Sequence, residues 1–298
     1  MISPNYLQKQ DTVAIVSTAR KITLQEIKPA IKLLESWGLK VIVGKTIGLE
    51  ENQFAGSEKE RINDFQKMLD NPEIKAIWCA RGGYGTIKII DQLNFTRFKE
   101  HPKWIIGYSD ITVLHSHIHN LGIETLHATM PINVTKNSKE ALTSLKNSLF
   151  GKVIFYEINA TKENKTGIVS GELVGGNLSI LYSLTGSKSA INTAGKILFL
   201  EDLDEYLYHI DRMMMNLKRN DYFTNLKGLI IGGMTDMRDN TIPFGKTAKE
   251  IILDIISEYN FPVTFNFPAG HISDNRTIIL GRKVTLDVNR NTTKLTFD

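Results

Sequence analysis

Ser109, in a sharp predicted turn, is the clearest candidate for chemistry in this sequence. The turn Gly107-Tyr108-Ser109-Asp110 follows an apolar, strand-like segment, Trp104–Ile106, and precedes a predicted helix over Ile111–Leu121. Such a turn would present Ser109 Oγ at the carboxyl end of a parallel sheet, where open α/β sheets place their sites. The helix dipole would favour negative charge developing there. A G-x-S-x-G nucleophile elbow is excluded, because Ile111 stands where its second glycine belongs. The same residues also fit an ordinary helix N-cap, for which Ser and Asp are both favoured.

A second turn, Arg81-Gly82-Gly83-Tyr84-Gly85, lies between a predicted strand, Ala76–Cys79, and a predicted helix over Thr86–Leu93. Its glycines would let the backbone approach a ligand closely, and the start of a helix favours anions. The turn matches neither G-x-G-x-x-G nor G-x-x-x-x-G-K-[ST], so the nucleotide interpretation is weak. A plain tight turn, a ligand-binding loop and an oxyanion hole all remain open. Arg81 could anchor a substrate carboxylate or brace this loop.

A serine nucleophile needs a general base, and the sequence holds seven histidines. His271 is the best placed, because it follows the turn Phe267-Pro268-Ala269-Gly270 and precedes polar residues. Three histidines share one predicted helix: His115, His117 and His119. No acidic residue accompanies them at ligand spacing, so buried or surface histidines are a simpler interpretation than a metal site. No motif surrounds His101 or His127, and His209 lies in a polar, helix-like stretch.

Carboxylates that could orient a histidine follow the apolar strand that ends at Leu200: Glu201, Asp202, Asp204 and Glu205. This cluster also fits a solvated cap, and it lacks the spacing of a calcium loop. A further glycine turn, Gly175-Gly176-Asn177-Leu178-Ser179, precedes a helical stretch and fits a turn with an N-cap. Cys79, the only cysteine, lies in a predicted buried strand and fits packing better than nucleophilic chemistry.

The elements that would hold these residues alternate between strand and helix in the first half of the chain. Capping boxes at Thr23/Glu26 and Ser57/Glu60 mark two helix starts. Short apolar runs predict the strands between the helices: Thr12–Ser17, Val41–Val43, Ala76–Cys79 and Trp104–Ile106. Strands that alternate with helices predict an α/β fold with a parallel sheet and right-handed crossovers.

The pattern changes after Pro131, where a predicted helix around Lys139–Phe150 is followed by a strand-like segment, Val153–Ile158. The polar segment Asn159–Lys165 follows, and we interpret residues 153–166 as a linker region between an N-terminal α/β domain, 1–152, and a C-terminal β-rich domain, 167–298. A third capping box, at Thr247 and Glu250, opens the helix Ala248–Tyr259. Short strands make up most of the remainder: Lys196–Leu200, Leu229–Ile231, Thr277–Leu280, Lys283–Val288 and Lys294–Phe297.

Composition excludes several classes of protein. The 298 residues are 42% apolar and 23% charged, which allows two ordinary domains with a sizeable core. The net charge of +4 is spread without a basic block, which argues against nucleic-acid binding. One cysteine permits no internal disulfide and no cysteine-rich zinc site. No apolar run reaches the roughly 20 residues of a membrane span, and the first residues lack the layout of a signal peptide, so we expect a soluble, cytoplasmic protein.

Six segments together resemble the LD-carboxypeptidase family of serine peptidases, the muramoyltetrapeptide carboxypeptidases. Each segment is unspecific alone, but six in the family's order over nearly the whole chain are hard to obtain by chance. The segments are Phe54-Ala55-Gly56, Arg81-Gly82-Gly83-Tyr84-Gly85, Gly107-Tyr108-Ser109-Asp110, Gly175-Gly176-Asn177-Leu178, Leu200-Glu201-Asp202 with Glu205 and Ile210-Asp211-Arg212, and Gly270-His271.

The resemblance implies a catalytic triad of Ser109 as nucleophile, His271 as general base and acid, and Glu201 as the carboxylate that orients the imidazole. Glu201 is preferred over its acidic neighbours because it heads the family's E-D-x-x-E segment. Backbone N–H groups of Gly83 and Asp110 would form the oxyanion hole, and no metal or other cofactor is implied. The resemblance also implies a flavodoxin-like N-terminal domain, a β-rich second domain, a site in the cleft between them, and homodimers.

The implied reaction is hydrolysis of the amide between an L-configured centre and a terminal D-amino acid, such as release of D-Ala from a muropeptide tetrapeptide in cytoplasmic peptidoglycan recycling. The partner would then be a small peptide, with no role for nucleic acid or membrane. The family also contains immunity peptidases that cut aminoacyl-nucleotide amides of microcin C-type antibiotics. All three tryptophans, Trp37, Trp78 and Trp104, lie in the first half, which favours the muropeptide over a stacked base. A non-catalytic nucleotide- or sugar-binding module is the alternative outside the enzymes.

Overall fold

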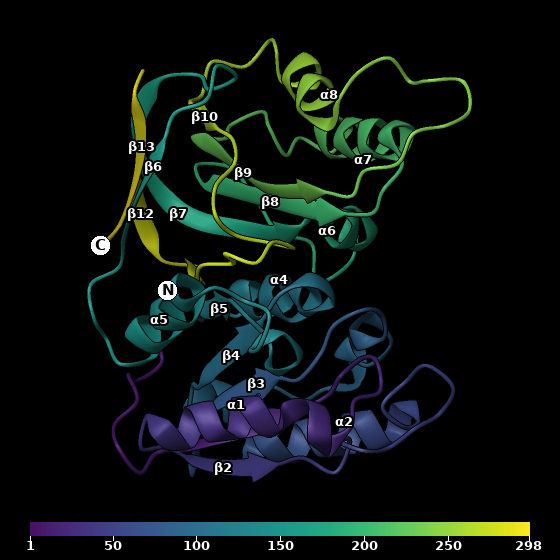
Figure 1. Ribbon diagram of the computed structural model, residues 1–298, viewed down its shortest axis with the longest axis vertical. Helices are drawn as coiled ribbons and strands as arrows, with labels where there is room; N and C mark the ends of the chain where they lie inside the picture. The colour runs from purple at the N-terminus through teal and green to yellow at the C-terminus, as the bar shows by residue number, and fades with distance from the viewer.

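The computed structural model describes all 298 residues and places them in two lobes, each built around one sheet (Figure 1). The first half of the chain forms the lower lobe in this view, and most of the second half forms the upper lobe. The helix α4 (Thr112–Asn120) and the strand β5 (Thr125–His127) lie where the two lobes meet. None of the helices is both long and apolar enough to cross a membrane.

The lower sheet has six strands in the order β11-β5-β4-β3-β1-β2. Its parallel part, β2-β1-β3-β4-β5, has the flavodoxin-like strand order, which confirms the fold class predicted for the N-terminal part. The sixth strand comes from the C-terminal part of the chain and pairs antiparallel with β5. The bounds are β1 (Thr12–Val16), β2 (Lys40–Val43), β3 (Ile74–Cys79), β4 (Trp104–Gly107), β5 (Thr125–His127) and β11 (Ile278–Leu280).

Helices cover both faces of this sheet because alternate residues of each strand point to opposite faces. Val13 and Ile15 of β1 share a core with the buried sides of α1 and α5. Ala14 and Val16, one residue out of phase, share a second core with α2 and α4. The helices of this lobe are α1 (Leu24–Ser36), α2 (Glu58–Asp70), α3 (Thr96–Glu100), α4 (Thr112–Asn120) and α5 (Lys139–Leu149).

The predicted capping boxes are present, but one predicted helix is not. Thr23/Glu26 and Ser57/Glu60 form reciprocal bonds at the starts of α1 and α2. The segment predicted as a helix over Thr86–Leu93 forms two 3-10 turns instead, η1 (Thr86–Lys88) and η2 (Ile90–Gln92). Polar contacts tie the start of this short connector in place, and 3-10 turns are the common form of such connectors.

The upper sheet has seven strands in the order β10-β9-β8-β7-β12-β13-β6. Its half from β7 to β10 is parallel, and its other half is an antiparallel meander. The β-rich second lobe with flanking helices is therefore confirmed. The strands are β6 (Phe155–Asn159), β7 (Gly167–Asn177), β8 (Ile197–Leu203), β9 (Gly228–Thr235), β10 (Val263–Thr264), β12 (Lys283–Val288) and β13 (Thr292–Phe297). The helices are α6 (Leu178–Leu184), α7 (Leu207–Arg219) and α8 (Ala248–Ile255).

Two segments depart from the predicted division of the chain. The interpreted linker region, 153–166, contains β6, which is hydrogen-bonded to β13 at the edge of the upper sheet. The chain therefore joins the upper sheet as early as Phe155. Later it returns to the lower sheet, where Ile278 pairs with His127 of β5. The lower sheet thus contains chain from both sides of the interpreted linker, and the upper sheet contains part of the linker itself.

The glycines at the end of β7 bring the lobes together. A Cβ on Gly175 would stand 1.9 Å from the carbonyl oxygen of Phe199 on β8. A Cβ on Gly176 would stand 2.5 Å from Thr112 Oγ1, at the start of α4 in the other lobe. Thr112 Oγ1 also accepts a hydrogen bond from the backbone N–H of Asn177 at 3.0 Å. The glycine turn noted in the sequence is therefore the close contact between β7 and α4.

Candidate active site

Ser109 occupies a strained position just after β4. It opens the short 3-10 turn η3 (Ser109–Ile111) that leads into α4. Its φ of 63° lies in the left-handed region, which costs a residue other than glycine about 1–2 kcal/mol. Neither η3 nor α4 has a side-chain cap, so the interpretation of Ser109 as a helix N-cap is wrong. Backbone strain of this kind collects at functional sites, where the surrounding structure holds it.

The glycine loop of residues 81–85 lies directly against Ser109. A Cβ on Gly82 would stand 3.1 Å from Ser109 Cβ and 3.4 Å from the backbone nitrogen of Asp110. The backbone N–H groups of Gly83 and Asp110 donate to no protein acceptor. Unpaired N–H donors beside a hydroxyl are the groups from which an oxyanion hole is built.

Two buried side chains hold the glycine loop against the serine turn. Asp110 Oδ2 accepts a hydrogen bond from the backbone N–H of Thr86 at 2.9 Å, just beyond the loop. Burial raises the pKa of this carboxyl above its usual value. Arg61, only 1% exposed, donates to the carbonyl oxygens of Thr18 at 2.7 Å and Gly85 at 2.9 Å. These contacts fix the loop from both sides, so its backbone is in place before any ligand arrives.

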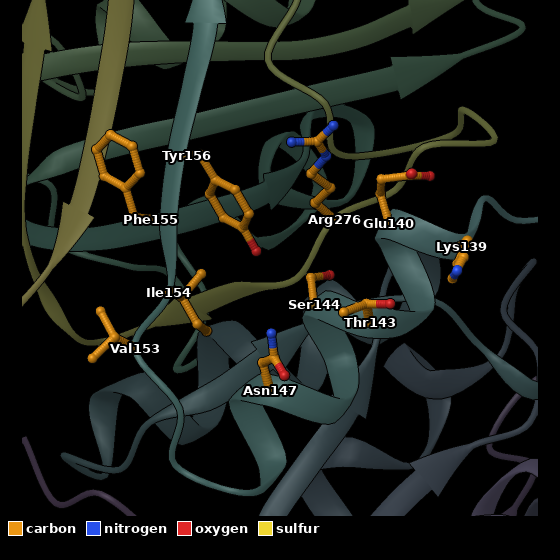
Figure 2. Close-up of a pocket in the computed structure, with 10 residues that line it drawn as sticks. All are labelled: Lys139, Glu140, Thr143, Ser144, Asn147, Val153, Ile154, Phe155, Tyr156 and Arg276. Atoms are coloured by element: carbon orange, nitrogen blue, oxygen red, sulfur yellow. The ribbon is translucent and has the colours of Figure 1, made fainter.

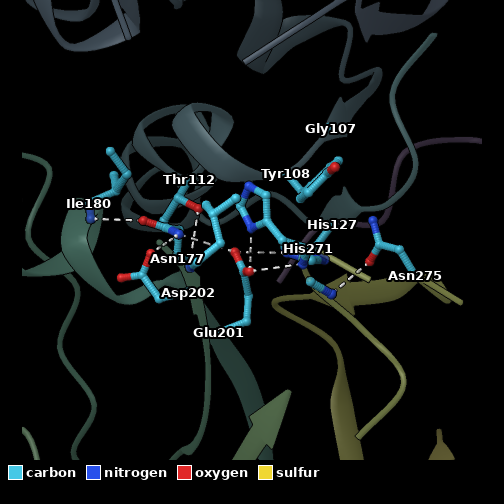
Figure 3. A network of polar contacts seen from close by, with 12 residues as sticks. Gly107, Tyr108, Thr112, His127, Asn177, Ile180, Glu201, Asp202, His271 and Asn275 are labelled. Carbon is cyan, nitrogen blue, oxygen red and sulfur yellow. Dashed lines mark hydrogen bonds and ion pairs between the residues drawn. The ribbon is translucent and has the colours of Figure 1, made fainter. Parts of the chain in front are cut away.

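Glu201 and His271 form a tight pair in the upper lobe (Figure 3). Glu201 lies in β8 and is fully buried. Its Oε2 accepts hydrogen bonds from His271 Nδ1 at 2.6 Å and from the backbone N–H of His271 at 3.1 Å. Gly270 permits this approach, since its φ is +106° and a Cβ there would stand 2.7 Å from Glu201 Oε2. His271 is therefore held both by its ring, through Nδ1, and by its backbone N–H, with Nε2 left free.

The charges of this pair reinforce each other. Burial alone would raise the pKa of Glu201, but the imidazoles of His271 and His127 hold it well below its usual range. Burial alone would lower the pKa of His271, and the Glu201 carboxylate more than offsets this and raises it. Burial and the Glu201 charge raise the pKa of the adjacent Asp202 to about 7. Two neighbouring carboxyls thus behave differently, a pattern common in acid–base sites.

The other carboxylates of the cluster face elsewhere. Asp202 accepts hydrogen bonds from Asn177 Nδ2 and from the backbone N–H of Ser179, both at 2.9 Å, at the start of α6. Glu205 Oε2 pairs with His209 Nδ1 at 2.6 Å, one turn along α7. Of the acidic residues considered from the sequence, only Glu201 contacts His271.

His127 is a neighbour of Glu201 that sequence motifs did not reveal. It is fully buried at the end of β5, and neither ring nitrogen has a hydrogen-bond partner. Its Nε2 lies 4.0 Å from Glu201 Oε1, the oxygen that His271 does not use. Asn177 Nδ2 approaches the same oxygen at 3.4 Å. Only the pairing of β4 with β5, which sets Gly107 opposite His127, brings this histidine to the site.

The candidate serine and histidine come from opposite lobes. Tyr108, the residue before Ser109, packs its ring on the His271 imidazole with centroids 4.8 Å apart. No hydrogen bond joins Ser109 Oγ to His271 Nε2; the imidazole is bonded through Nδ1 to Glu201. Catalytic hydrogen bonds are often long in ligand-free enzymes and tighten when substrate binds.

The remaining candidates from the sequence are engaged in packing or local pairs. His115 is buried between Thr125 Oγ1 at 2.8 Å and the carbonyl oxygen of Gly107 at 2.9 Å, and burial lowers its pKa to about 3. His117 contacts Ser189, and His119 contacts Glu172, so the three histidines of α4 have separate partners. No cluster of His, Cys, Asp and Glu is arranged to hold a metal ion.

Cys79 and one prominent pocket also lie outside this site. Cys79 is fully buried, and burial raises the pKa of its thiol. The pocket opens between α5 and β6, and none of the candidate triad residues lines it (Figure 2). Two of its polar side chains are engaged within the protein, since Tyr156 Oη donates to the Thr277 carbonyl at 2.7 Å and Arg276 pairs with Asp274 at 2.9 Å.

Two family models cover most of the chain. The LD-carboxypeptidase N-terminal domain matches residues 13–128, and the LD-carboxypeptidase C-terminal domain matches residues 170–286. The chain belongs to the LD-carboxypeptidase family and is a peptidase.

The chain is similar to several named proteins over nearly its full length. The chain is 34% identical to a probable murein peptide carboxypeptidase of Bacillus subtilis, over 95% of this chain and 91% of that protein. It is 27% identical to the murein tetrapeptide carboxypeptidase of Pseudomonas aeruginosa, over 93% and 94% of the two chains. It is also 25% identical to the microcin C7 self-immunity protein MccF of Escherichia coli, over 96% and 93%.

A solved structure shares the fold. The muramoyltetrapeptide carboxypeptidase of Oxalobacter formigenes superimposes with a TM-score of 0.87 at 24% identity, over 96% of this chain and 98% of that one. The two-lobed arrangement is therefore that of the family.

Proposed function

We propose that this protein is a serine-type LD-carboxypeptidase that releases D-Ala from muropeptide tetrapeptides. Ser109 is the nucleophile, His271 the general base and then acid, and Glu201 the carboxylate that orients His271. The relatives from Bacillus subtilis and Pseudomonas aeruginosa, named for murein peptides, support this substrate class. In this role, in peptidoglycan recycling, the protein would act in the cytoplasm. The family resemblance also implies a homodimer.

The arrangement of the pair supports the first chemical step. Because Glu201 takes Nδ1 of His271, the free Nε2 is the nitrogen that accepts the proton of Ser109 Oγ. The oxygen then attacks the amide carbonyl, and the N–H groups of Gly83 and Asp110 bind the oxyanion that forms. Removing one oxyanion-hole donor typically costs about 10²–10³-fold in rate. The imidazolium, stabilised by the Glu201 carboxylate, next protonates the nitrogen of the departing D-amino acid.

The second half of the reaction repeats these roles with water. His271 takes a proton from a water molecule, which attacks the acyl-enzyme ester, and returns that proton to Ser109 Oγ. The protein supplies every group needed through its own side chains and backbone, so no metal is required by this mechanism. The one observation that carries the proposal is the buried Glu201–His271 pair, 2.6 Å apart, opposite a strained serine beside two unpaired N–H donors.

Mass spectrometry of a tetrapeptide muropeptide incubated with the protein tests this proposal. Wild-type protein should release one D-alanine, and Ser109→Ala should release none above background. Equal cleavage by both proteins would exclude the serine mechanism. A tetrapeptide left intact by wild-type protein would exclude the recycling substrate. Unchanged ligand binding and biological function in Ser109→Ala would instead favour a non-catalytic binding module.

A second candidate function is cleavage of aminoacyl-nucleotide amides, as in immunity to microcin C-type antibiotics. The similarity to MccF, solved in complex with aspartyl sulfamoyl adenosine, favours it. That structure superimposes with a TM-score of 0.86 at 23% identity, over 98% of this chain and 97% of that one. Against it, Trp78 and Trp104 are fully buried and Trp37 is 8% exposed, so no tryptophan offers a stacking surface. Incubation with such a conjugate distinguishes the two substrate classes.

A further inference from the structure

A carboxypeptidase must recognise the free carboxylate at the end of its substrate. Arginine is the residue best suited to this task, because its planar guanidinium can donate two parallel hydrogen bonds to a carboxylate. Three cationic side chains belong to the two loops that flank Ser109: Arg20, Lys21 and Arg81. Their positions and partners differ, and the differences single out one of them.

Arg20 lies across the glycine loop. A Cβ on Gly83 would stand 2.5 Å from Arg20 Cδ and 2.9 Å from Arg20 Nε. A Cβ on Gly82, the preceding residue, would stand 3.3 Å from Ser109 Oγ. The stem of Arg20 and the hydroxyl of Ser109 therefore contact consecutive glycines of the same loop.

The backbone of Arg20 is fixed while its guanidinium is free. The Arg20 carbonyl oxygen accepts a hydrogen bond from Ser17 Oγ at 2.7 Å, and Arg20 forms an isolated bridge with Phe54. The side chain is exposed, and no hydrogen bond or ion pair to the protein occupies its guanidinium. The neighbouring cations are engaged, since Lys21 pairs with Glu50 and Arg81 donates to the Lys21 carbonyl at 3.2 Å.

The spacing suits a terminal residue. In a peptide, the terminal carboxylate carbon lies three bonds from the scissile carbonyl carbon, so the two are at most about 4 Å apart. Consecutive Cα atoms such as those of Gly82 and Gly83 are about 3.8 Å apart. A substrate with its scissile carbonyl at Ser109, beside Gly82, therefore has its terminal carboxylate within reach of the side of the loop that Arg20 covers.

We propose that Arg20 binds the free α-carboxylate of the departing D-amino acid and so restricts the enzyme to terminal residues. This assignment rests on the proposed carboxypeptidase function and names the group that makes it an exopeptidase. Arg81, considered from the sequence as a possible anchor, braces the loop through the Lys21 carbonyl instead.

Two matched substrates test the assignment: a tetrapeptide with a free D-Ala carboxylate and the same peptide as its C-terminal amide. The readout is the ratio of kcat/KM for the acid to kcat/KM for the amide. Arg20→Met keeps the apolar stem over Gly83 and removes the charge, and it should lower this ratio about 10- to 100-fold, the range expected for losing a hydrogen bond to a charged group. Arg20→Lys, which keeps a point charge, should restore part of it.

Lys21→Met is the control, because it removes one positive charge from the same loop and should leave the ratio unchanged. If Arg20→Met lowers kcat/KM equally for the acid and the amide, the assignment is wrong. It is also wrong if the ratio falls in Lys21→Met or Arg81→Met and not in Arg20→Met. Calorimetry separates this assignment from the reaction itself. Protein with Ser109→Ala should bind the acid more tightly than the amide, and adding Arg20→Met should abolish the preference.

The cleavage assay and the binding assay test the reaction and the carboxylate site separately. If wild-type protein cleaves neither peptide while the Ser109→Ala protein prefers the acid through Arg20, the proposed reaction is wrong and the carboxylate site stands. If Ser109→Ala binds both peptides equally, the carboxylate site is wrong whether or not wild-type protein cleaves them.

Discussion

Replacing Glu201 by glutamine tests the central pair most directly. The carboxylate accepts two hydrogen bonds from His271 at Oε2, and its Oε1 faces Asn177 Nδ2 and His127 Nε2. Glutamine has one side-chain oxygen. If its NH₂ group faces His271, both hydrogen bonds to His271 are lost; if its oxygen faces His271, the NH₂ group lies against Asn177 Nδ2. Losing two hydrogen bonds to a charged group, at about 1.5–3 kcal/mol each, predicts a fall in kcat of roughly 10²–10⁴-fold.

The pH profile of the same variant carries an independent prediction. His271 must be neutral to act as a base, and Glu201 raises its pKa, so wild-type kcat/KM should rise as the pH passes through a value above the ordinary 6.5. Glutamine removes the charge and leaves burial, which lowers the pKa of His271. The acidic limb of Glu201→Gln should therefore move to lower pH, and its deficit against wild type should be smallest in acid.

Timed assays of D-alanine release at a series of pH values measure both the fall in kcat and the shift of the acidic limb. Circular dichroism checks that the variant is folded. Glu205→Gln is the matched control, because Glu205 pairs with His209 and does not contact His271. Its kcat and its profile should match wild type. A folded Glu201→Gln protein that keeps a third of wild-type kcat with an unmoved acidic limb would refute the role assigned to Glu201.

Three further changes give separate expectations. Gly270→Ala should abolish peptide release in the mass-spectrometric assay, because its Cβ would stand 2.7 Å from Glu201 Oε2 at a φ of +106°; activity near wild type would contradict the close approach. Ser109→Gly should unfold at higher urea than Ser109→Ala, by about 0.5–1 kcal/mol, because glycine relieves the φ of 63°; equal midpoints would show that the turn is not strained. His127→Gln should lower kcat about tenfold and leave KM unchanged, because Glu201 Oε1 loses a neighbour that holds its pKa down; a change confined to KM would exclude a role through Glu201.

Local signals predicted the elements that local interactions build. The capping boxes at Thr23, Ser57 and Thr247 depend on residues three positions apart, and all three form at helix starts. The parallel direction of the lower strands followed from alternation of strand and helix patterns, whereas their flavodoxin-like order was implied by the family resemblance. The C-terminal helix ends at Ile255, before the predicted Tyr259, since helix ends depend on tertiary packing.

Elements made by distant pairing escaped prediction. The strand β7, Gly167–Asn177, contains four glycines, which depress strand propensity, and its stability comes from β8 and β12 on either side. The strand β5 has three residues, too few for a periodic signal. The strand β11 was predicted over Thr277–Leu280, but its pairing with β5, about 150 residues away in the chain, was not.

The candidate site divides in the same way. Ser109 and His271 stood out because each follows a strand or turn with a recognisable pattern. Glu201 was selected from its acidic neighbours by the family resemblance, and the roles of all three stay predictions. His127 and Arg20 carry no pattern. The first reaches Glu201 through strand register, and the second reaches the glycine loop through a bridge to Phe54. Neither long-range contact leaves a trace in nearby sequence.

The return of the chain to the lower sheet has a consequence for biosynthesis. When a ribosome has released residues 1–128, β5 is an open edge strand, and the strand that covers it, β11, is still about 150 residues from being made. At roughly 5–20 residues per second this interval lasts about 8–30 s. During it the nascent lower lobe exposes unpaired backbone at His127 and Leu126, a template for pairing with another chain. Slow translation or truncation before Ile278 should therefore favour aggregation over a free N-terminal lobe.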